Sequence, residues 1–305
     1  MFEPDRNFFL SLSSWDIKST FLMYSLLDGL FHLPNIRDIS LNFLIPGSSQ
    51  RPGIFPLCRF SHLHSIKLAS ISNPPFYFDI LQQLTKSVGR HPDLIHLDIG
   101  LSNDNTIFSN LECVLHYIIN NTTGVTKTVP LKLQSLRVHG VTLQIDSFTL
   151  PHLRYLSTLD ISWLPARDNS RIWSSLQTAS IRLTKISVDR ICVGLLDYLS
   201  SYPGLQHFSL VPPEKRVASV TMSDHSLQTR FFDRVLVGHA EHLRTLHLGR
   251  KSHPREWRLT LANMVSLSTC KNVYEMGISI PFDDLGREDF LVSEDLGSLT
   301  CLTTY

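Results

Sequence analysis

The stretch AEHLRTLHLGR, residues 240 to 250, contains the pattern that decides the fold. Leu243 is followed by Leu246 and Leu248, and His247 stands between the last two. Apolar side chains two residues apart suit a strand, whereas a helix places them three and four apart. The stretch therefore predicts a short strand with one buried side and one side that faces solvent.

The same spacing recurs along the whole chain of 305 residues. Each segment starts with an apolar residue and carries further apolar residues three and five positions later, which is the kind of internal repetition that marks an array. The nine full segments are IRDISL (36–41), LHSIKL (63–68), LIHLDI (94–99), LQSLRV (133–138), LSTLDI (156–161), LTKISV (183–188), LQHFSL (205–210), LRTLHL (243–248) and VYEMGI (273–278), and an incomplete tenth is LTCL (299–302).

The residues between the apolar positions provide an independent test of the repeat. They were not used to choose the segments. Because 43% of the chain is hydrophobic, many of these positions would be apolar by chance. At the second, fourth and sixth positions after the nine starts, only Ala69 and Val211 are apolar. Alternation of this kind is typical of a strand with one buried face. We therefore interpret the repeat as real.

The pattern resembles the leucine-rich repeat, whose unit reads L-x-x-L-x-L-x-x-N/C-x-L and forms a strand followed by a helix or a looser return. The resemblance covers roughly residues 33 to 303 and implies an α/β solenoid with a parallel concave sheet and convex helices. The family's asparagine or cysteine at the ninth position is missing from every segment; the residues there are Leu44, Ile71, Ser102, Val141, Leu164, Ile191, Pro213, Lys251 and Pro281. We therefore expect an irregular arc. Its domains would be an N-terminal helical cap at residues 1–32 and a single array at residues 33–305.

Helices are expected between the strands, because parallel strands need a crossover. Apolar residues at helical spacing predict them in five intervals: around 77–88, 107–119, 192–199, 227–236 and 259–267. In the last of these, Leu259, Ala262, Met264, Val265 and Leu267 are expected to face the core. We interpret these apolar stripes as core packing, with ligand pockets as the alternative.

Composition and motifs disfavour several classes of protein. The formal net charge is +1, with 28 basic and 27 acidic side chains, so a nucleic-acid partner is not expected. The five cysteines have no CxxC spacing, and the start MFEPDRNFF is unlike a secretory leader, so an intracellular protein, cytoplasmic or nuclear, without a membrane span is expected. Catalytic fingerprints are not found, and the pairs His62/His64 and His239/His242 supply too few ligands for zinc. We expect no cofactor, no metal and no enzymatic activity.

The outward positions of the strands supply the candidate site. The hypothesis is a non-enzymatic scaffold that binds a protein partner on its concave face. The expected contact residues are Lys67, His96, Asp98, Arg137, His139, Asp160, His207, Ser209 and His247. Histidine titrates near neutrality, so four of these residues could make the face sensitive to pH, although ordinary solvent-facing residues remain the alternative.

The segments HLPNIRDISL, HPDLIHLDIG and LPHLRYLSTLDIS are also similar to the divergent leucine-rich arrays of F-box proteins. That resemblance implies substrate recognition for a ubiquitin ligase, with the ligase adaptor as a second partner. An L-P-x-E-like F-box motif was not found in the chain. The alternatives are an enzyme or small-ligand-binding protein hosted on the repeat, and a degenerate copy of the family.

Overall fold

The computed structural model describes residues 29, 36–42, 57–60, 62–71, 74–101, 115, 118, 119, 129–140, 143–162, 170–211, 225–248, 257 and 261–278. The chain divides into two compact units, and each is described by itself. Unit 1 comprises Met1–Leu156 and Trp163–Ala166, and unit 2 comprises Ser157–Ser162 and Arg167–Tyr305. The expected cap at residues 1–32, apart from Gly29, and the tenth segment at 299–302 lie outside the described residues.

A strand begins at the third residue of each of the nine full segments, so the strands that the alternation predicted are present. Strand order follows chain order within each unit, from β1 to β4 in unit 1 and from β5 to β9 in unit 2, and the strand pairs within each unit are parallel. The α/β class with an open parallel sheet is therefore confirmed. The finer expectation, a leucine-rich-repeat solenoid, stays a prediction.

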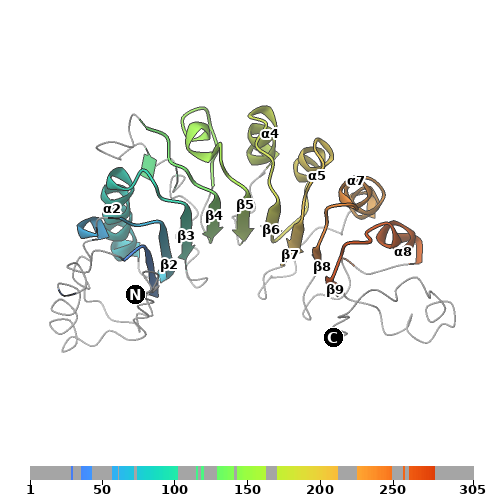
Figure 1. The fold of residues 1–305 in the computed structure, drawn as a ribbon, viewed down its shortest axis with the longest axis horizontal. Helices are drawn as coiled ribbons and strands as arrows, with labels where there is room; N and C mark the ends of the chain where they lie inside the picture. Colours follow the sequence, from blue (N-terminus) through green and yellow to red (C-terminus); the bar gives the residue numbers. More distant parts are fainter. Residues whose placement is uncertain are drawn as a thin grey trace, which may run out of the picture. The chain divides into compact units, whose positions relative to one another are not determined.

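In its described part, unit 1 contains four strands and three helical elements with described bounds, and Gly29, Leu115, Ile118 and Ile119 are also helical. The strands are β1 (Asp38–Asn42), β2 (Ser65–Ile71), β3 (His96–Leu101) and β4 (Ser135–His139), and the helices are the 3₁₀ turns η1 (Leu57–Arg59) and η4 (Leu150–Leu153) and the α-helix α2 (Pro74–Arg90). Figure 1 shows α2 on one side of the strands. Leu81, Leu84 and Val88 of α2 are buried together with Ile66 and Leu97 of the strands, so the predicted helical stripe is core.

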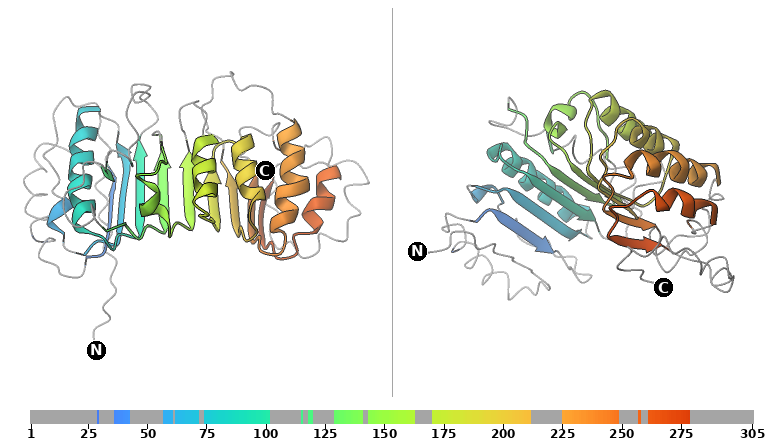
Figure 2. Two further views of the ribbon diagram at one scale, coloured as in Figure 1. Left: turned by 90° about the horizontal axis from the view of Figure 1, so that it is seen from above. Right: turned by 45° about the vertical axis from the view of Figure 1, so that its right-hand side comes forward.

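Unit 2 contains five strands and a series of helices. The strands are β5 (Thr158–Ser162), β6 (Lys185–Val188), β7 (His207–Leu210), β8 (Thr245–Leu248) and β9 (Glu275–Ile278). The helices are α4 (Ser170–Thr178), α5 (Val193–Ser200), α6 (His225–Arg230), the π-helical η5 (Phe231–Leu236), α7 (Val237–His239) and α8 (Leu261–Ser268). Figures 1 and 2 show these helices side by side on one side of β5–β9.

The interval between β7 and β8 holds the helix that the spacing predicted, but its middle has a wider turn. Residues 225–239 run through α6, η5 and α7 without a break, and the central six residues are π-helical. Phe231, Phe232, Val235 and Leu236 are buried, as expected. The sequence pattern predicted the buried stripe and gave no sign of the π-helical turn.

The expected core face of α8 is partly wrong. Val265 is 72% exposed, whereas Leu267 is 5% exposed. Asn263 and Ser266 are buried instead. Positions 263, 266 and 267 share one face of an α-helix, and that face points away from Val265. In the interval around 107–119, only Leu115, Ile118 and Ile119 are described, and all three are buried.

Two buried tyrosine side chains bind backbone groups just before a strand of unit 2. The hydroxyl of Tyr198 accepts from the Leu183 amide at 3.1 Å and donates to the Ile181 carbonyl at 2.8 Å. The hydroxyl of Tyr202 donates to the Leu183 carbonyl at 2.8 Å. These contacts matter because a buried backbone group without a partner is costly. Tyr198 of α5 and Tyr202, just after α5, thus satisfy the backbone just before β6.

Aromatic side chains of unit 2, including these two tyrosines, form a continuous column. Trp173, Tyr198, Tyr202 and His239 follow one another with ring centroids 5.6, 5.1 and 5.5 Å apart. Spacings of this size are typical of attractive aromatic contacts. In unit 1, His152 plays a related part, because its Nδ1 accepts from the Leu131 amide at 3.2 Å. The chain lacks the family's asparagine or cysteine at the ninth position, and other buried polar side chains bind its backbone instead.

Candidate functional site

The strand face of unit 1 that lies opposite α2 carries polar side chains in regular rows. Parallel pairing places Ser40, Lys67, Asp98 and Arg137 next to one another on successive strands. A second row holds Asp38, Ser65, His96 and Ser135, and a third brings Gly100 next to His139. The five unit 1 residues predicted from the sequence, Lys67, His96, Asp98, Arg137 and His139, therefore share one face, and none of them is buried.

The central row of this face is a charge cluster. One oxygen of Asp98, Oδ2, lies 3.9 Å from Lys67 Nζ and 3.4 Å from Arg137 Nη1. The Asp98 side chain is 18% exposed, while those of Lys67 and Arg137 are 48% and 42% exposed. Ion pairs this exposed contribute little to stability. Two cations with one carboxylate also leave the row with a net positive charge.

The strand face of unit 2 combines hydroxyl groups with titratable ones. One row holds Asp160, Ser187, Ser209, His247 and Gly277 on successive strands, and the adjacent row holds Thr158, Lys185, His207, Thr245 and Glu275. The four unit 2 residues predicted from the sequence, Asp160, His207, Ser209 and His247, lie in these rows and are partly exposed. Lys185 and Glu275 were missed as candidates, although they occupy the same outward position in their segments as His207.

His207 and His247 differ in their surroundings. His207 Nδ1 lies 3.0 Å from the Thr245 hydroxyl, and desolvation, followed by the charges of Lys185 and Arg244, lowers the pKa of His207. His247 Nε2 lies 3.1 Å from Glu275 Oε1. The imidazole of His247 also covers Gly277, where an added Cβ would come within 2.9 Å of Nδ1. The two histidines therefore have different neighbours on this face.

Several outward strand positions are closed to a partner. Ser162, Asp189 and Thr245 occupy such positions, but each is buried. Asp189 pairs with Arg190, whose Nε lies 3.2 Å from Asp189 Oδ1. Alternation predicts which side of a strand a residue lies on, and neighbouring side chains then decide whether solvent reaches it.

Both ring nitrogens of His239 bind backbone groups, so this side chain is not arranged as a metal ligand. Its Nδ1 accepts from the Leu205 amide at 3.1 Å, so Nε2 carries the proton and donates to the Leu199 carbonyl at 3.0 Å. Burial lowers the pKa of His239 to about 4. In the part of the chain that the structure describes, groups of histidine, cysteine and carboxylate residues suited to a metal ion are absent.

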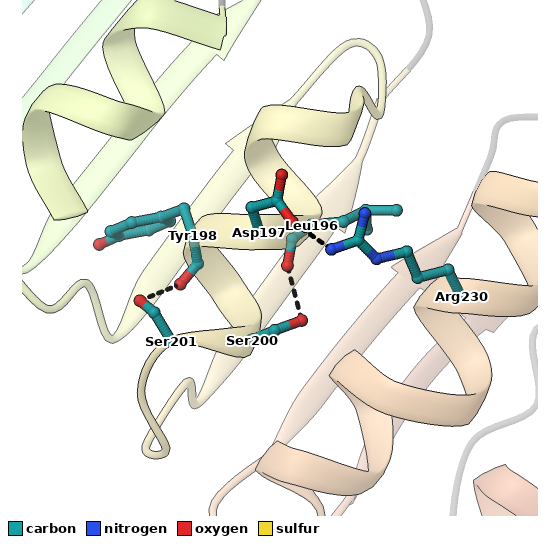
Figure 3. Close-up of polar contacts among 6 residues, drawn as sticks. All are labelled: Leu196, Asp197, Tyr198, Ser200, Ser201 and Arg230. Atoms are coloured by element: carbon teal, nitrogen blue, oxygen red, sulfur yellow. Dashed lines mark hydrogen bonds and ion pairs between the residues drawn. The ribbon is translucent and has the colours of Figure 1, made fainter.

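The helix side of unit 2 carries one prominent ion pair. Figure 3 shows Arg230 of α6 reaching Asp197 of α5, with its Nη2 bound to the Asp197 carboxylate. Nearby, the hydroxyls of Ser200 and Ser201 donate to the carbonyls of Leu196 and Tyr198, at 2.7 and 2.6 Å. These contacts connect two neighbouring helices and close the end of α5. We interpret this cluster as structural.

Comparison with known proteins adds no family. The chain matches no protein-family model and no curated protein. Among the described residues, no helix combines the length and apolar character needed to cross a bilayer.

Proposed function

We propose that this protein is a non-enzymatic scaffold that binds a partner protein through the solvent-facing side of its strands. The observation that carries the proposal is the row formed by Lys67, Asp98 and Arg137, in register on three adjacent strands of unit 1. Helices occupy the other side of these strands, so the charged row can be reached only from the open face. Protein interfaces with mixed charges of this kind gain orientation and specificity.

The chemistry of the face supports binding more than catalysis. A catalytic site brings several titratable groups into a cleft and shifts their pKa values strongly. The strongest shifts among the described histidines belong to His91 and His239, which are buried and lie away from the strand face. On the face itself, Lys67 and Arg137 each pair with Asp98, and both cations are partly exposed. An enzyme or small-ligand site remains the alternative hypothesis.

The test exchanges the charges of Asp98 and Arg137 in the full chain. Asp98→Arg with Arg137→Asp keeps an opposite pair but places the new arginine beside Lys67. A partner is first captured with the wild-type protein and identified, and its affinity for purified wild-type and exchanged chains is then measured. We expect a loss of at least about tenfold in affinity, because the charge pattern is reversed.

A matched control tests whether the loss of affinity depends on the strand face or follows any exchange of surface charges. Lys132 Nζ lies 2.8 Å from Asp93 Oδ1 in another exposed ion pair of unit 1, just before the strands. Exchange of Lys132 and Asp93 is expected to leave the affinity unchanged, and both exchanged proteins are expected to keep the wild-type melting temperature. Equal affinity in all three proteins would place the binding surface elsewhere.

The resemblance to F-box-associated arrays extends the proposal to substrate recognition for a ubiquitin ligase inside the cell. Cys58, Cys192 and Cys270 are thiols without a disulfide, which suits a reducing compartment. The direct test is a pull-down of the purified ligase adaptor subunit with this chain. A complex would support ligase recruitment by the chain, and no complex would remove that role from it.

A further inference from the structure

The charged row of unit 1 lies beside a floor of small residues. Ala69 follows Lys67 by two positions on β2, Gly100 follows Asp98 on β3, and His139 follows Arg137 on β4. A Cβ placed on Gly100 would lie 3.7 Å from Ala69 Cα and 4.0 Å from His139 Cβ. The three strands are therefore adjacent here as well. We call the whole set the basic patch: Lys67, Ala69, Asp98, Gly100, Arg137 and His139.

The basic patch carries two cations, Lys67 and Arg137, and one carboxylate, Asp98. An ammonium group has three donors and a guanidinium group has five, and neither has an acceptor. Both cations approach the same atom, Asp98 Oδ2, at 3.9 and 3.4 Å, which is loose for charge-assisted hydrogen bonds. Their side chains remain almost half exposed. A second carboxylate supplied from outside could therefore bind the same two cations.

The small floor makes that approach possible. Lys67 and Arg137 are long, whereas Ala69 and Gly100 add almost nothing above the strand backbone. A peptide that lies over Ala69 and Gly100 meets Lys67 and Arg137 along one edge and His139 at its end. Glycine is often found where another backbone approaches closely.

We propose that the basic patch binds an acidic peptide segment of the partner protein, with a glutamate or aspartate carboxylate between Lys67 and Arg137. This inference rests on the proposed function, because it assigns the chemistry of the partner to the same face. A peptide carboxylate fits better than a phosphate group or a nucleic acid. Asp98 stands at the centre of the patch and repels a dianion, and nucleic acids require a longer series of cations than this row offers.

The experiment titrates the full chain with a terminally blocked Glu-Gly-Glu-Gly-Glu peptide and follows amide NMR signals of Ala69, Gly100 and Arg137. We expect saturable shifts at these three positions, which weaken as salt is added. The matched Gln-Gly-Gln-Gly-Gln peptide is expected to bind at least about tenfold more weakly, since it lacks the charges.

Two kinds of variant make the result specific. Lys67→Gln with Arg137→Gln removes the charges, and Gly100→Val fills the floor without changing any charge; each is expected to reduce peptide affinity at least about tenfold. Lys132→Gln is the control and is expected to bind like the wild type. Gly100→Ala replaces Gly100→Val if the larger side chain lowers the melting temperature.

Several outcomes would overturn the inference. Equal binding of the glutamine peptide would do so, as would tighter binding of inorganic phosphate or of a thymidine oligonucleotide. If the glutamate peptide does not bind while the Asp98/Arg137 exchange still weakens the captured partner, the acidic-peptide inference fails and the proposed function stands. If the peptide binds but the exchange leaves the partner's affinity unchanged, the proposed function fails instead.

Discussion

His239 holds the backbone amide of Leu205, 34 residues away in sequence, through a hydrogen bond of 3.1 Å from that amide to the imidazole Nδ1. The other ring nitrogen donates to the carbonyl of Leu199. One side chain at the end of α7 thus joins the end of α5 to the start of β7. The bond pattern requires a neutral imidazole, because a protonated Nδ1 could no longer accept the Leu205 amide.

This arrangement predicts that unit 2 loses stability in mild acid. Burial lowers the pKa of His239 from 6.5 to about 4, so the folded state favours the neutral ring. The stabilisation is fully present above pH 6.5 and is lost progressively as the pH falls towards 4, with a limit of roughly 3 kcal/mol. Urea unfolding at pH 7.5, 6 and 5 measures it.

His239→Gln is the informative variant for this effect. It should be less stable than the wild type at pH 7.5 and should show a weaker dependence on pH below 6.5. Burial also lowers the pKa of His91 to about 4, so unit 1 loses stability in acid in both proteins. Identical pH slopes for wild type and His239→Gln would contradict the prediction.

The two buried tyrosines of unit 2 predict unequal costs for the same change. Both changes remove the contact between the two tyrosine hydroxyls. Tyr198→Phe also removes an acceptor for the Leu183 amide and a donor to the Ile181 carbonyl, whereas Tyr202→Phe removes one further contact to the backbone, the donor to the Leu183 carbonyl. Since an unsatisfied buried group costs about 1–3 kcal/mol, Tyr198→Phe should lower the free energy of unfolding more than Tyr202→Phe. Chemical denaturation of both variants decides the order, and the reverse order would refute it.

Two helical glycines predict opposite effects of substitution by alanine. A Cβ on Gly194 of α5 would lie 2.9 Å from Ser170 Cα, so Gly194→Ala forces α4 and α5 apart at a cost of about 1–3 kcal/mol. Gly238 of α7 has open space around it, and Gly238→Ala should raise stability by about 0.5–1 kcal/mol, because alanine favours helix. Thermal unfolding of both variants measures the difference, and a stabilised Gly194→Ala protein would show that the helices are not in close contact.

The corrected orientation of α8 predicts which of its apolar residues can be replaced. Val265→Lys should change the free energy of unfolding by less than about 0.5 kcal/mol, since the side chain is 72% exposed. Leu267→Ala should cost about 2–4 kcal/mol, since this side chain is buried. If Val265→Lys proved the more damaging change in chemical denaturation, the orientation derived from the sequence would be right after all.

The positions of the strands could be read from the sequence because the signal was local. In LIHLDI, Leu97 and Ile99 alternate with Asp98, and any parallel strand built from these residues must bury two and expose one. The same reasoning placed Lys67, Asp98 and Arg137 on one side of their strands. Lys67 and Arg137 both approach one carboxylate oxygen of Asp98, and this depends on strand register and side-chain length, which alternation does not specify.

The sequence by itself determined which segments form strands, which side of each is apolar, and most of the helical intervals, because these features depend on residues a few positions apart. Only the tertiary structure decided which polar side chains are buried and what they bind. His239, Tyr198 and Tyr202 appear in the sequence as ordinary polar or aromatic residues, yet each holds a backbone group that is distant along the chain. Long-range hydrogen bonds of this kind depend on which repeats pack together, and no local pattern records that.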